Sequence, residues 1–592
     1  MTQDITSDSL TLPPPPIDEY PYNLGSYSKT VTTSSPDAQR WFNRGLTWTY
    51  AFHHLEAVRC FKYAAACDPS CAMAYWGIAY AAGPNYNKTW ENFDTEELRS
   101  ALIECHLAAL RAAELATAPQ EKALTAALVK RFPLRRADID TRILTADGPK
   151  CDELGQWNRV YADEMAKVYK DYPDNLDVAA VYADSLMQLA PWELWDIQTG
   201  APRERSQTLL IKEVLERALE QSAAMSHPGV LHFYIHLMEL SPWPERALQA
   251  SDALLGLVPD GGHLQHMPGH IDLLVGDYRR AIAGNLLAIE ADEKYVHHGT
   301  ANDFYAFYRL HDYTFPIYAA MFSGQFKVAM DTVERMETSL SDEFLRIPSP
   351  PMIDWMEGFK TYRIEVLVRF GKWDDLLALP FPDDREFYCV TTTFMHYGRA
   401  LALGLTGRLD EADAEQKLFR EARAAIKPSR QAFPNQWQDI LNVAEEMLQG
   451  ELVYRKGNFE EGFAHLRKSI HYADNLVYAE PWGWLQPPRH AYAALLLEQN
   501  RVEDAAKVYA EDLGFSTSLP RAVRHPNNVW ALHGYHECLV RLGRTAEASM
   551  LVPQLSVALA VADVPIESSC YCRRVKKDCN GASECAEACS KL

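Results

Sequence analysis

The sequence predicts an all-α fold, a solenoid of about eight or nine stacked helix pairs. Two observations lead to this prediction. The chain has 592 residues, whereas a single hydrophobic core stops growing at about 250–300 residues. A glycine-centred signature also recurs along the chain, as expected for an array of similar helix pairs. An ordinary helical bundle is the alternative, but chance apolar periodicity would not keep this register.

The first helix pair lies in residues 41–69. Small residues there let two helices approach closely, aromatic residues fill the space between them, and a proline ends the second helix. In chain order these residues are Trp41, Gly45, Trp48, Ala57, Phe61, Ala64 and Pro69. Their order resembles the tetratricopeptide (TPR) pattern, a helix–turn–helix repeat of about 34 residues.

The later helix pairs share a shorter signature, in which a turn glycine is followed five residues later by a small residue of the second helix. It occurs at Gly276 with Ala281, Gly324 with Ala329, Gly407 with Ala412, Gly457 with Gly462, and Gly543 with Ala548. The segments 244–247 and 500–505 are variants, the second with Asn500 in place of glycine. Segments 83–87 and 190–205 interrupt the array and are expected to be loops.

These patterns divide the chain into four parts. We expect a flexible, proline-rich arm in residues 1–35, a first TPR-like half in residues 36–345, a second half in residues 352–560, and a cysteine-rich tail in residues 561–592. Residues 346–351 are the expected linker between the halves. The tail cysteines fit either disulfides or metal capture, and their spacing matches no strong zinc module. They are Cys570, Cys572, Cys579, Cys585 and Cys589.

The charge of the chain restricts its partners and location. The formal net charge is −22, which disfavours binding to nucleic-acid phosphates and to anionic membranes. No apolar run reaches the roughly 18 residues needed to cross a bilayer. The N-terminus lacks the features of a secretory signal, so a cytoplasmic location is expected.

Histidines concentrate in residues 226–312. His232, His236 and Glu239 are spaced to share one helix face, and so are His263, His266 and His270. His232 and His266 are 34 residues apart, as are His236 and His270, so each pair takes equivalent places in adjacent repeats. We expect this face to line the concave side of the solenoid. His311 opens the next repeat, and Asp184 falls in the same stripe by register.

This arrangement predicts a transition-metal site. Clustered neutral imidazoles with a carboxylate suit copper, iron or zinc, and histidines one turn apart on a helix can share a metal. The predicted ligands are His232, His236, His263, His266, His270 and His311. No thiolate lies near, so copper or iron is favoured over a structural zinc ion. The alternative is a packing histidine copied by repeat duplication without any metal.

Two functions follow from these residues. The first is a metal-dependent oxidoreductase that uses O₂ on a small molecule, and zinc-assisted hydrolysis would use the same ligands. Its expected catalytic residues are Glu239 and Asp184, and its expected pocket residues are Tyr234, Tyr305, Tyr308 and Trp192. The second is a non-catalytic adaptor that holds a protein partner in its concave groove. Nucleotide-binding and serine-hydrolase motifs are absent from the sequence.

The chain also resembles an uncharacterised family of TPR-like proteins of bacteria and fungi, over residues 41–563. The marks of the resemblance are the segments 52–57, 75–77, 83–87, 191–192, 227–229 with His232 and His236, and 266–270. Members read Asn-His-Asp-Glu-Ala at residues 53–57, so His53 and Leu55 depart from the pattern and His54 matches it. The resemblance implies a TPR-like fold and no settled chemistry.

Overall fold

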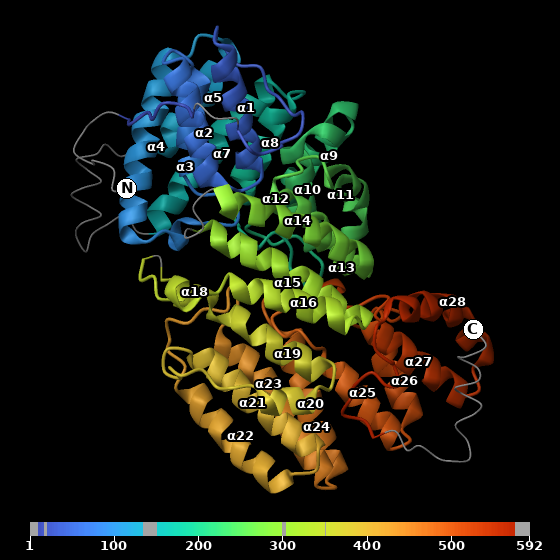
Figure 1. The fold of residues 1–592 in the computed structure, drawn as a ribbon. Helices are drawn as coiled ribbons and strands as arrows, with labels where there is room; N and C mark the ends of the chain where they lie inside the picture. The colour runs from blue at the N-terminus through green and yellow to red at the C-terminus, as the bar shows by residue number, and fades with distance from the viewer. Residues whose placement is uncertain (1–9, 17–19, 134–150, 299–303, 350, 575–592) are drawn as a thin grey trace. The chain divides into compact units, whose positions relative to one another are not determined.

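The computed structural model describes residues 10–16, 20–133, 151–298, 304–349 and 351–574. Within these ranges the regular structure is helical, and β-type pairing is limited to two isolated bridges, Trp195 with Pro202 and Ala432 with Asn435. Successive helices form antiparallel pairs joined by tight turns (Figure 1). The prediction of an all-α, TPR-like helix-pair fold is therefore confirmed.

The chain forms two compact units. Unit 1 consists of residues 1–271 and 287–305, and unit 2 consists of residues 272–286 and 306–592. The expected linker, residues 346–351, lies within unit 2, and the four-part division of the chain stays a prediction. The points where the chain passes between the units lie at α13, α14 and the start of α15.

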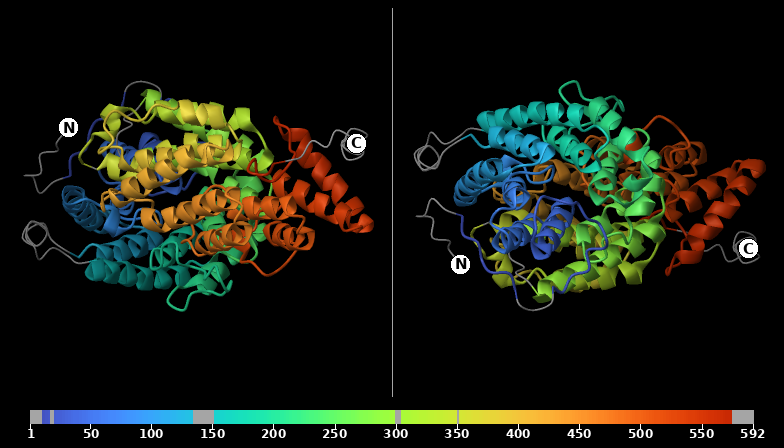
Figure 2. Two further views of the ribbon diagram at one scale, coloured as in Figure 1. Left: turned by 90° about the horizontal axis from the view of Figure 1, so that it is seen from below. Right: turned by 90° about the horizontal axis from the view of Figure 1, so that it is seen from above.

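Unit 1 is an array in which each helix packs on the next. Helices α1 to α4 contact one another in order, and α7, α8 and α9 do the same. Figure 2 shows these helices in blue to green from two further sides. The helices are α1 (Pro36–Tyr50), α2 (His54–Cys67), α3 (Ala72–Ala82), α4 (Thr95–Leu115), α5 (Pro119–Arg131), α7 (Cys151–Asp171), α8 (Leu176–Met187), α9 (Thr208–Leu219), α10 (Pro228–Glu239), α11 (Leu248–Leu254) and α12 (Gly262–His266), followed by the shared α13 (Pro268–Val275) and α14 (Tyr278–His298).

Unit 2 repeats the arrangement, with α21 packed on α22, α23 on α24, α25 on α26 and α27 on α28. Its helices are α15 (Tyr305–Ser323), α16 (Phe326–Thr338), α17 (Asp342–Leu345), α18 (Met352–Met356), α19 (Tyr362–Arg369), α20 (Trp373–Ala378), α21 (Cys389–Leu405), α22 (Leu409–Ala424), α23 (Trp437–Arg455), α24 (Phe459–Asp474), α25 (Pro488–Glu498), α26 (Val502–Asp512), α27 (Val529–Arg541) and α28 (Thr545–Val561).

The turns between paired helices use a left-handed backbone conformation, which ends the first helix and reverses the chain. Glycine adopts this conformation without a steric penalty from a Cβ atom. The five turn glycines of the signature all have positive φ, and Asn500 has φ of 59° in the equivalent turn. The φ angles are 78° at Gly276, 73° at Gly324, 88° at Gly407, 91° at Gly457 and 70° at Gly543.

The TPR-like residues of the first pair meet at Phe61. Its ring is fully buried on α2, between Gly45 of α1 and Gly77 of α3. A Cβ atom at Gly45 would lie 2.7 Å from the Phe61 ring, and one at Gly77 would lie 2.4 Å from it. Both glycines therefore allow a large ring to fill the space between three helices.

The described part of the N-terminal arm lies along the helices of unit 1. Trp48 Nε1 donates a hydrogen bond of 2.6 Å to the hydroxyl of Tyr20, and Lys29 Nζ lies 3.2 Å from a carboxylate oxygen of Asp177. Residues 20–35 are thus anchored by side chains of α1 and α8. Among the described residues, no helix combines the length and the apolar character that crossing a bilayer requires.

Candidate metal centre

Two helices of unit 1 supply the central histidines. Helix α10 begins at Pro228, a residue that suits the first turn of a helix. The side chain of His227 caps this end, because it accepts a hydrogen bond of 3.2 Å from the backbone N–H of Val230. His232 and His236 follow one turn apart on this helix. The expected helix of residues 263–270 is interrupted only at Met267, because Pro268 has no N–H to donate. Helix α12 ends at His266 and α13 begins at Pro268, while the Met267 backbone keeps α-helical angles.

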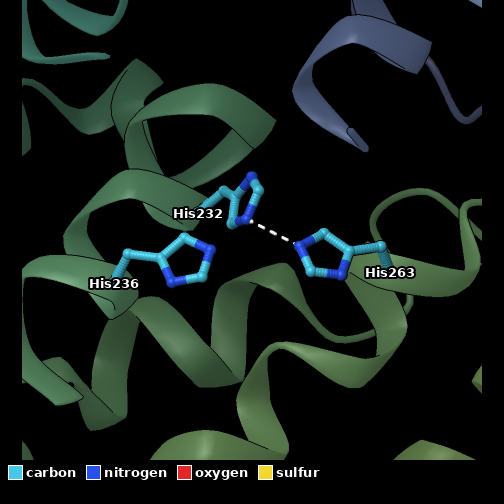
Figure 3. A group of neighbouring side chains, drawn as sticks. All are labelled: His232, His236 and His263. Carbon is cyan, nitrogen blue, oxygen red and sulfur yellow. Dashed lines mark hydrogen bonds between the residues drawn. The ribbon is translucent and has the colours of Figure 1, made fainter. Parts of the chain in front are cut away.

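The rings of His232, His236 and His263 converge (Figure 3). One nitrogen from each lies within 4.8 Å of the others, and the Nε2 atoms of His232 and His263 are 3.1 Å apart. Two nitrogens bound to the same tetrahedral ion are separated by about 3.3 Å, given bonds of about 2.0 Å. The exposed fractions of the three side chains are 0, 0 and 1%. We call these three residues the histidine triad.

Hydrogen bonds fix the orientation of two triad rings. His232 Nδ1 donates to the backbone carbonyl of Tyr50 at 2.7 Å, and His236 Nδ1 donates to Glu239 Oε1 at 2.9 Å. In a neutral imidazole with a proton on Nδ1, Nε2 carries a lone pair. His236 Nε2 is buried and has no hydrogen-bond partner among the described residues. Both rings thus present a metal-binding nitrogen to the centre of the triad.

The surroundings keep the triad uncharged. Burial lowers the pKa of His232, His236 and His263 well below the ordinary value, and the neighbouring histidines lower it further. A protonated imidazole would lose its hydration there, and its charge would repel any charge on the neighbouring histidines. The triad is therefore in the neutral form that binds metals at physiological pH.

A second histidine pair lies beside the triad in unit 1. The Nε2 atoms of His266 and His270 are 2.7 Å apart, and both side chains are buried. Glu239 connects the two groups, because its Oε2 lies 2.9 Å from His270 Nδ1 while its Oε1 binds His236. The structure thus places five of the predicted histidine ligands and Glu239 together.

Phe52 covers the triad from the turn between α1 and α2. Its ring centroid lies 4.5 Å from that of His232, 5.8 Å from that of His236 and 5.3 Å from that of His263. Its φ is 53°, the conformation that later pairs assign to glycine or asparagine. A bulky side chain in this region costs about 1–2 kcal/mol. Such strain is concentrated at functional sites, and here it holds an aromatic ring against three imidazoles.

Trp192 is a second aromatic residue held in this conformation, with φ of 59°. Its ring lies 6.1 Å from His236, edge to face, and stacks on Tyr86 at 5.6 Å. Tyr86 in turn lies 5.0 Å from His236. Trp192 was predicted to line a pocket, and the structure places it against a ring of the triad.

The remaining predicted residues of unit 1 make other contacts. Asp184 on α8 is buried and accepts hydrogen bonds from the Tyr80 hydroxyl and from Gln188 Nε2, and burial raises its pKa to about 6. The Tyr234 hydroxyl on α10 lies 3.4 Å from Oε1 of Glu216 on α9. The Tyr305 hydroxyl donates to Asp292 at 2.8 Å, and its ring stacks on His53 at 3.6 Å. A catalytic role for Asp184 and pocket roles for both tyrosines stay predictions.

His311 and Tyr308 belong to unit 2. The His311 ring lies 5.1 Å from that of Phe315, edge to face, on the same helix α15, and Tyr308 is buried. Their predicted roles as ligand and pocket residue stay predictions.

Sequence reasoning missed the residues that surround the triad. Tyr50 contributes a backbone carbonyl, which any residue could supply, so no side-chain pattern marks it. Phe52 and Tyr86 lie in segments 52–57 and 83–87, which carry the family resemblance, but the sequence pattern gives neither residue a role at the site. A bulky residue at position 52, where later turns place glycine or asparagine, is the signal that would have identified Phe52.

The comparisons with known proteins add little to this geometry. No family model matches the sequence, and no curated protein is significantly similar to it. Yeast Tom70 is 12% identical with a TM-score of 0.30, over 88% of this chain and 99% of that chain. An IFIT1 monomeric mutant with Gppp-AAAA is 10% identical with a TM-score of 0.31, over 88% and 96%. The Cut9 complex with Hcn1 from the APC/C is 11% identical with a TM-score of 0.24, over 89% and 96%. These TM-scores lie below 0.5, so the likenesses say nothing about what this chain binds.

Proposed function

We propose that this protein is a TPR-like repeat scaffold whose unit 1 holds a transition-metal ion at His232, His236 and His263. The convergence of three buried, neutral imidazoles from two helices is the observation that carries the proposal. Kinship with the TPR-like proteins of bacteria and fungi is part of the same proposal and rests on the sequence marks given above.

The donor set indicates the class of metal. Imidazole nitrogens suit copper, iron and zinc, whereas calcium and magnesium require mostly oxygen ligands. Three protein ligands leave one position of a tetrahedral ion open, as in catalytic zinc sites. Copper or iron, favoured by the absence of thiolates near the cluster in the sequence, stays the expectation for the ion.

The burial of the triad supports a scaffold more than an enzyme. The triad side chains are at most 1% exposed, and the Phe52 ring stacks on His236 and His263 and meets His232 edge to face. A substrate from solvent must reach the open position of the ion, whereas an ion that only stabilises the fold needs no such access. Oxidation of a small molecule with O₂ therefore stays a prediction from ligand type alone.

Elemental analysis of protein purified without an affinity tag tests the metal. We expect about one equivalent of a transition metal in the wild type, and its loss in a His232→Ala/His263→Ala variant. His106→Ala is the control, because His106 on α4 is also buried but donates a hydrogen bond to the backbone carbonyl of Phe132, after α5. If the double variant keeps the metal of the wild type while its helicity persists, the triad is not the site.

Azide binding separates the scaffold from the enzyme. In protein loaded with Cu²⁺ or Co²⁺, azide changes the visible spectrum only when it reaches an open coordination position. An unchanged spectrum supports a closed site in a scaffold. A saturable change that is lost in the His232→Ala/His263→Ala variant supports a catalytic centre.

We also propose that the scaffold self-associates through its last helix pair, α27 and α28. In α28, Met550 is 82% exposed and Val557 is 64% exposed. Residues 548–561 contain no charged side chain, although the chain carries a net charge of −22. Two copies can therefore meet at α28 with less repulsion than an acidic surface would give. A hollow of about 510 Å³ between α27 and α28 offers space for apolar side chains.

Sedimentation across a range of concentrations tests self-association. We expect a dimer in the wild type and a monomer after Met550→Glu/Val557→Glu. Leu209→Glu is the control, because Leu209 is 64% exposed on α9. A wild type that stays monomeric at every concentration excludes a second copy as the occupant of α28.

A further inference from the structure

Unit 2 contains a separate group of metal-ligand atoms. The group consists of Glu451 on α23 and of Cys570 and Cys572 in the segment after α28. One carboxylate oxygen and the two sulfurs lie within 4.8 Å of one another. The exposed fractions are 1% for Glu451, 7% for Cys570 and 2% for Cys572. We call these three residues the thiol–carboxylate group.

The Glu451 carboxylate is buried without a hydrogen-bond donor among the described residues, which favours a cation beside it. Both of its carboxylate oxygens are buried, and neither accepts a hydrogen bond from any residue in the described ranges. Burying a carboxylate without donors costs several kcal/mol. Arg455, one turn later on α23, has its guanidinium 3.5 Å from Glu498. Burial raises the pKa of Glu451, and the positive charge of Arg455 partly offsets this.

The cysteine segment is held in place by contacts that do not involve the sulfurs. The Ser569 hydroxyl donates to the backbone carbonyl of His490 at 2.7 Å. The Arg573 guanidinium donates to both carboxylate oxygens of Glu537, at 2.6 and 2.8 Å. Residues 569–573 therefore lie against α25 and α27 through contacts other than the bond between the sulfurs, and the two sulfurs lie beside Glu451.

We propose that the reduced Cys570 and Cys572, together with Glu451, bind a zinc ion. Thiolates and carboxylates are both zinc ligands, with Zn–S distances of about 2.3 Å and Zn–O distances of about 2.0–2.2 Å. Ligand atoms within 4.8 Å of one another fit around such an ion. The ion replaces the thiol protons of both cysteines and gives the Glu451 carboxylate a direct contact in place of the hydrogen bond that no described residue donates to it.

The oxidised cysteines exclude the ion. The structure joins Cys570 and Cys572 in a disulfide, and zinc requires the thiolate forms. A phosphine reductant converts the disulfide to two thiols. It supplies two electrons, takes an oxygen atom from water to become the phosphine oxide, and the two water protons go to the sulfurs. The zinc site and the disulfide are thus alternative states of the same two residues.

Cobalt titration of the full-length, phosphine-reduced protein tests the proposal. A thiolate bound to Co²⁺ gives an ultraviolet sulfur-to-metal charge-transfer band, which the histidine triad cannot produce because it has no sulfur. We expect the band to saturate at about one equivalent and to bleach when Zn²⁺ is added. Protein left in the disulfide form should show no band.

Three variants decide whether the named residues are the ligands. Cys570→Ser/Cys572→Ser should abolish the band, and Glu451→Gln should weaken Zn²⁺ binding by about tenfold or more. A Cys579→Ser/Cys585→Ser/Cys589→Ser variant should retain the band, and these three cysteines lie outside the described residues. A band that survives in the first variant, or disappears in the last, would overturn the proposal. Unchanged Zn²⁺ affinity in Glu451→Gln would exclude the carboxylate, and retained helicity in each variant shows that the fold is intact.

Discussion

Glu239 Oε1 accepts a hydrogen bond of 2.9 Å from His236 Nδ1, and both side chains are buried on α10. The other oxygen of Glu239 lies 2.9 Å from His270 Nδ1. One carboxylate therefore orients a histidine of the triad and a histidine of the neighbouring pair. Such outer carboxylates fix the ring orientation and raise the basicity of metal-bound histidines. The structure thus supports an orienting role for Glu239, whereas its predicted catalytic role stays a prediction.

Replacing Glu239 by Gln should weaken metal binding without removing the ligands. The amide keeps one acceptor for His236 but places an N–H₂ group toward His270, so that ring loses the carboxylate oxygen that lies 2.9 Å from its Nδ1. We expect the affinity of the triad for its ion to fall by about 10–100-fold. Competition with a chelator of known affinity measures the change.

Asp184→Asn is the control for this experiment. Asp184 is also a buried carboxylate of unit 1, but its hydrogen bonds are to Tyr80 and Gln188. The metal affinity of this variant should equal that of the wild type. Equal affinities of all three proteins would show that Glu239 does not orient a ligand.

Phe52→Gly separates backbone strain from the role of the ring. The substitution removes the penalty of the left-handed conformation, about 1–2 kcal/mol, but it also removes the ring that stacks on the triad. We expect faster exchange of the bound metal with a chelator, because the imidazoles lose their cover.

Asn500→Gly relieves the same kind of backbone conformation in unit 2, where φ is 59°. It also removes the hydrogen bond of 2.7 Å that Arg541 donates to Asn500 Oδ1, so we expect the free energy of unfolding to change by no more than about 1 kcal/mol and metal exchange to stay unchanged. If Phe52→Gly exchanges its metal at the wild-type rate, the strained ring does not cover the site.

The sequence predicts the histidine cluster in part. Repeat spacing correctly brings together His232, His236, His266 and His270 as neighbours, because equivalent places in adjacent helix pairs lie side by side. It does not predict that His263 is the third member of the triad. The position 34 residues before His263 is Gly229 on α10, so the repeat spacing that pairs the other histidines does not mark His263.

Residues far away in the chain could not be predicted in the same way. The Tyr50 carbonyl and the Phe52 ring lie 182 and 180 positions before His232, and their contacts depend on how α10 packs against α1. By contrast, the turn glycines were predictable, since a left-handed turn after a helix selects glycine through local sterics alone.

The packing of Phe61 gives a test of the repeat architecture. Gly77→Ala places a Cβ atom 2.4 Å from the buried Phe61 ring, so α2 and α3 must move apart or the ring must leave its position. We expect a loss of about 1–3 kcal/mol in the free energy of unfolding, seen as a lower midpoint of thermal unfolding. Gly155→Ala is the control, because its added Cβ meets no atom within 4 Å on α7. Its unfolding midpoint should be unchanged or higher, since alanine is the better helix former.

Glu365 should make the stability of unit 2 depend on pH. This residue of α19 is 8% exposed, and burial raises the pKa of its carboxyl to about 8, from an ordinary value of 4.5. The folded state therefore keeps a proton that the unfolded state releases. The stabilisation is complete below pH 4.5 and is lost as the pH rises toward 8, at about 1.4 kcal/mol for each unit of pKa difference.

Glu365→Gln removes this dependence, because the amide has the shape of the protonated acid and does not ionise. At about pH 5 the two proteins should have similar unfolding midpoints, and at about pH 9 the variant should unfold at the higher temperature. Glu343→Gln is the control, since Glu343 is exposed on α17, and it should follow the wild type at both pH values. If the wild type and Glu365→Gln respond identically to pH, then Glu365 is ionised in the folded protein. Its burial would then be offset by a donor or a cation, as we propose for Glu451 on α23.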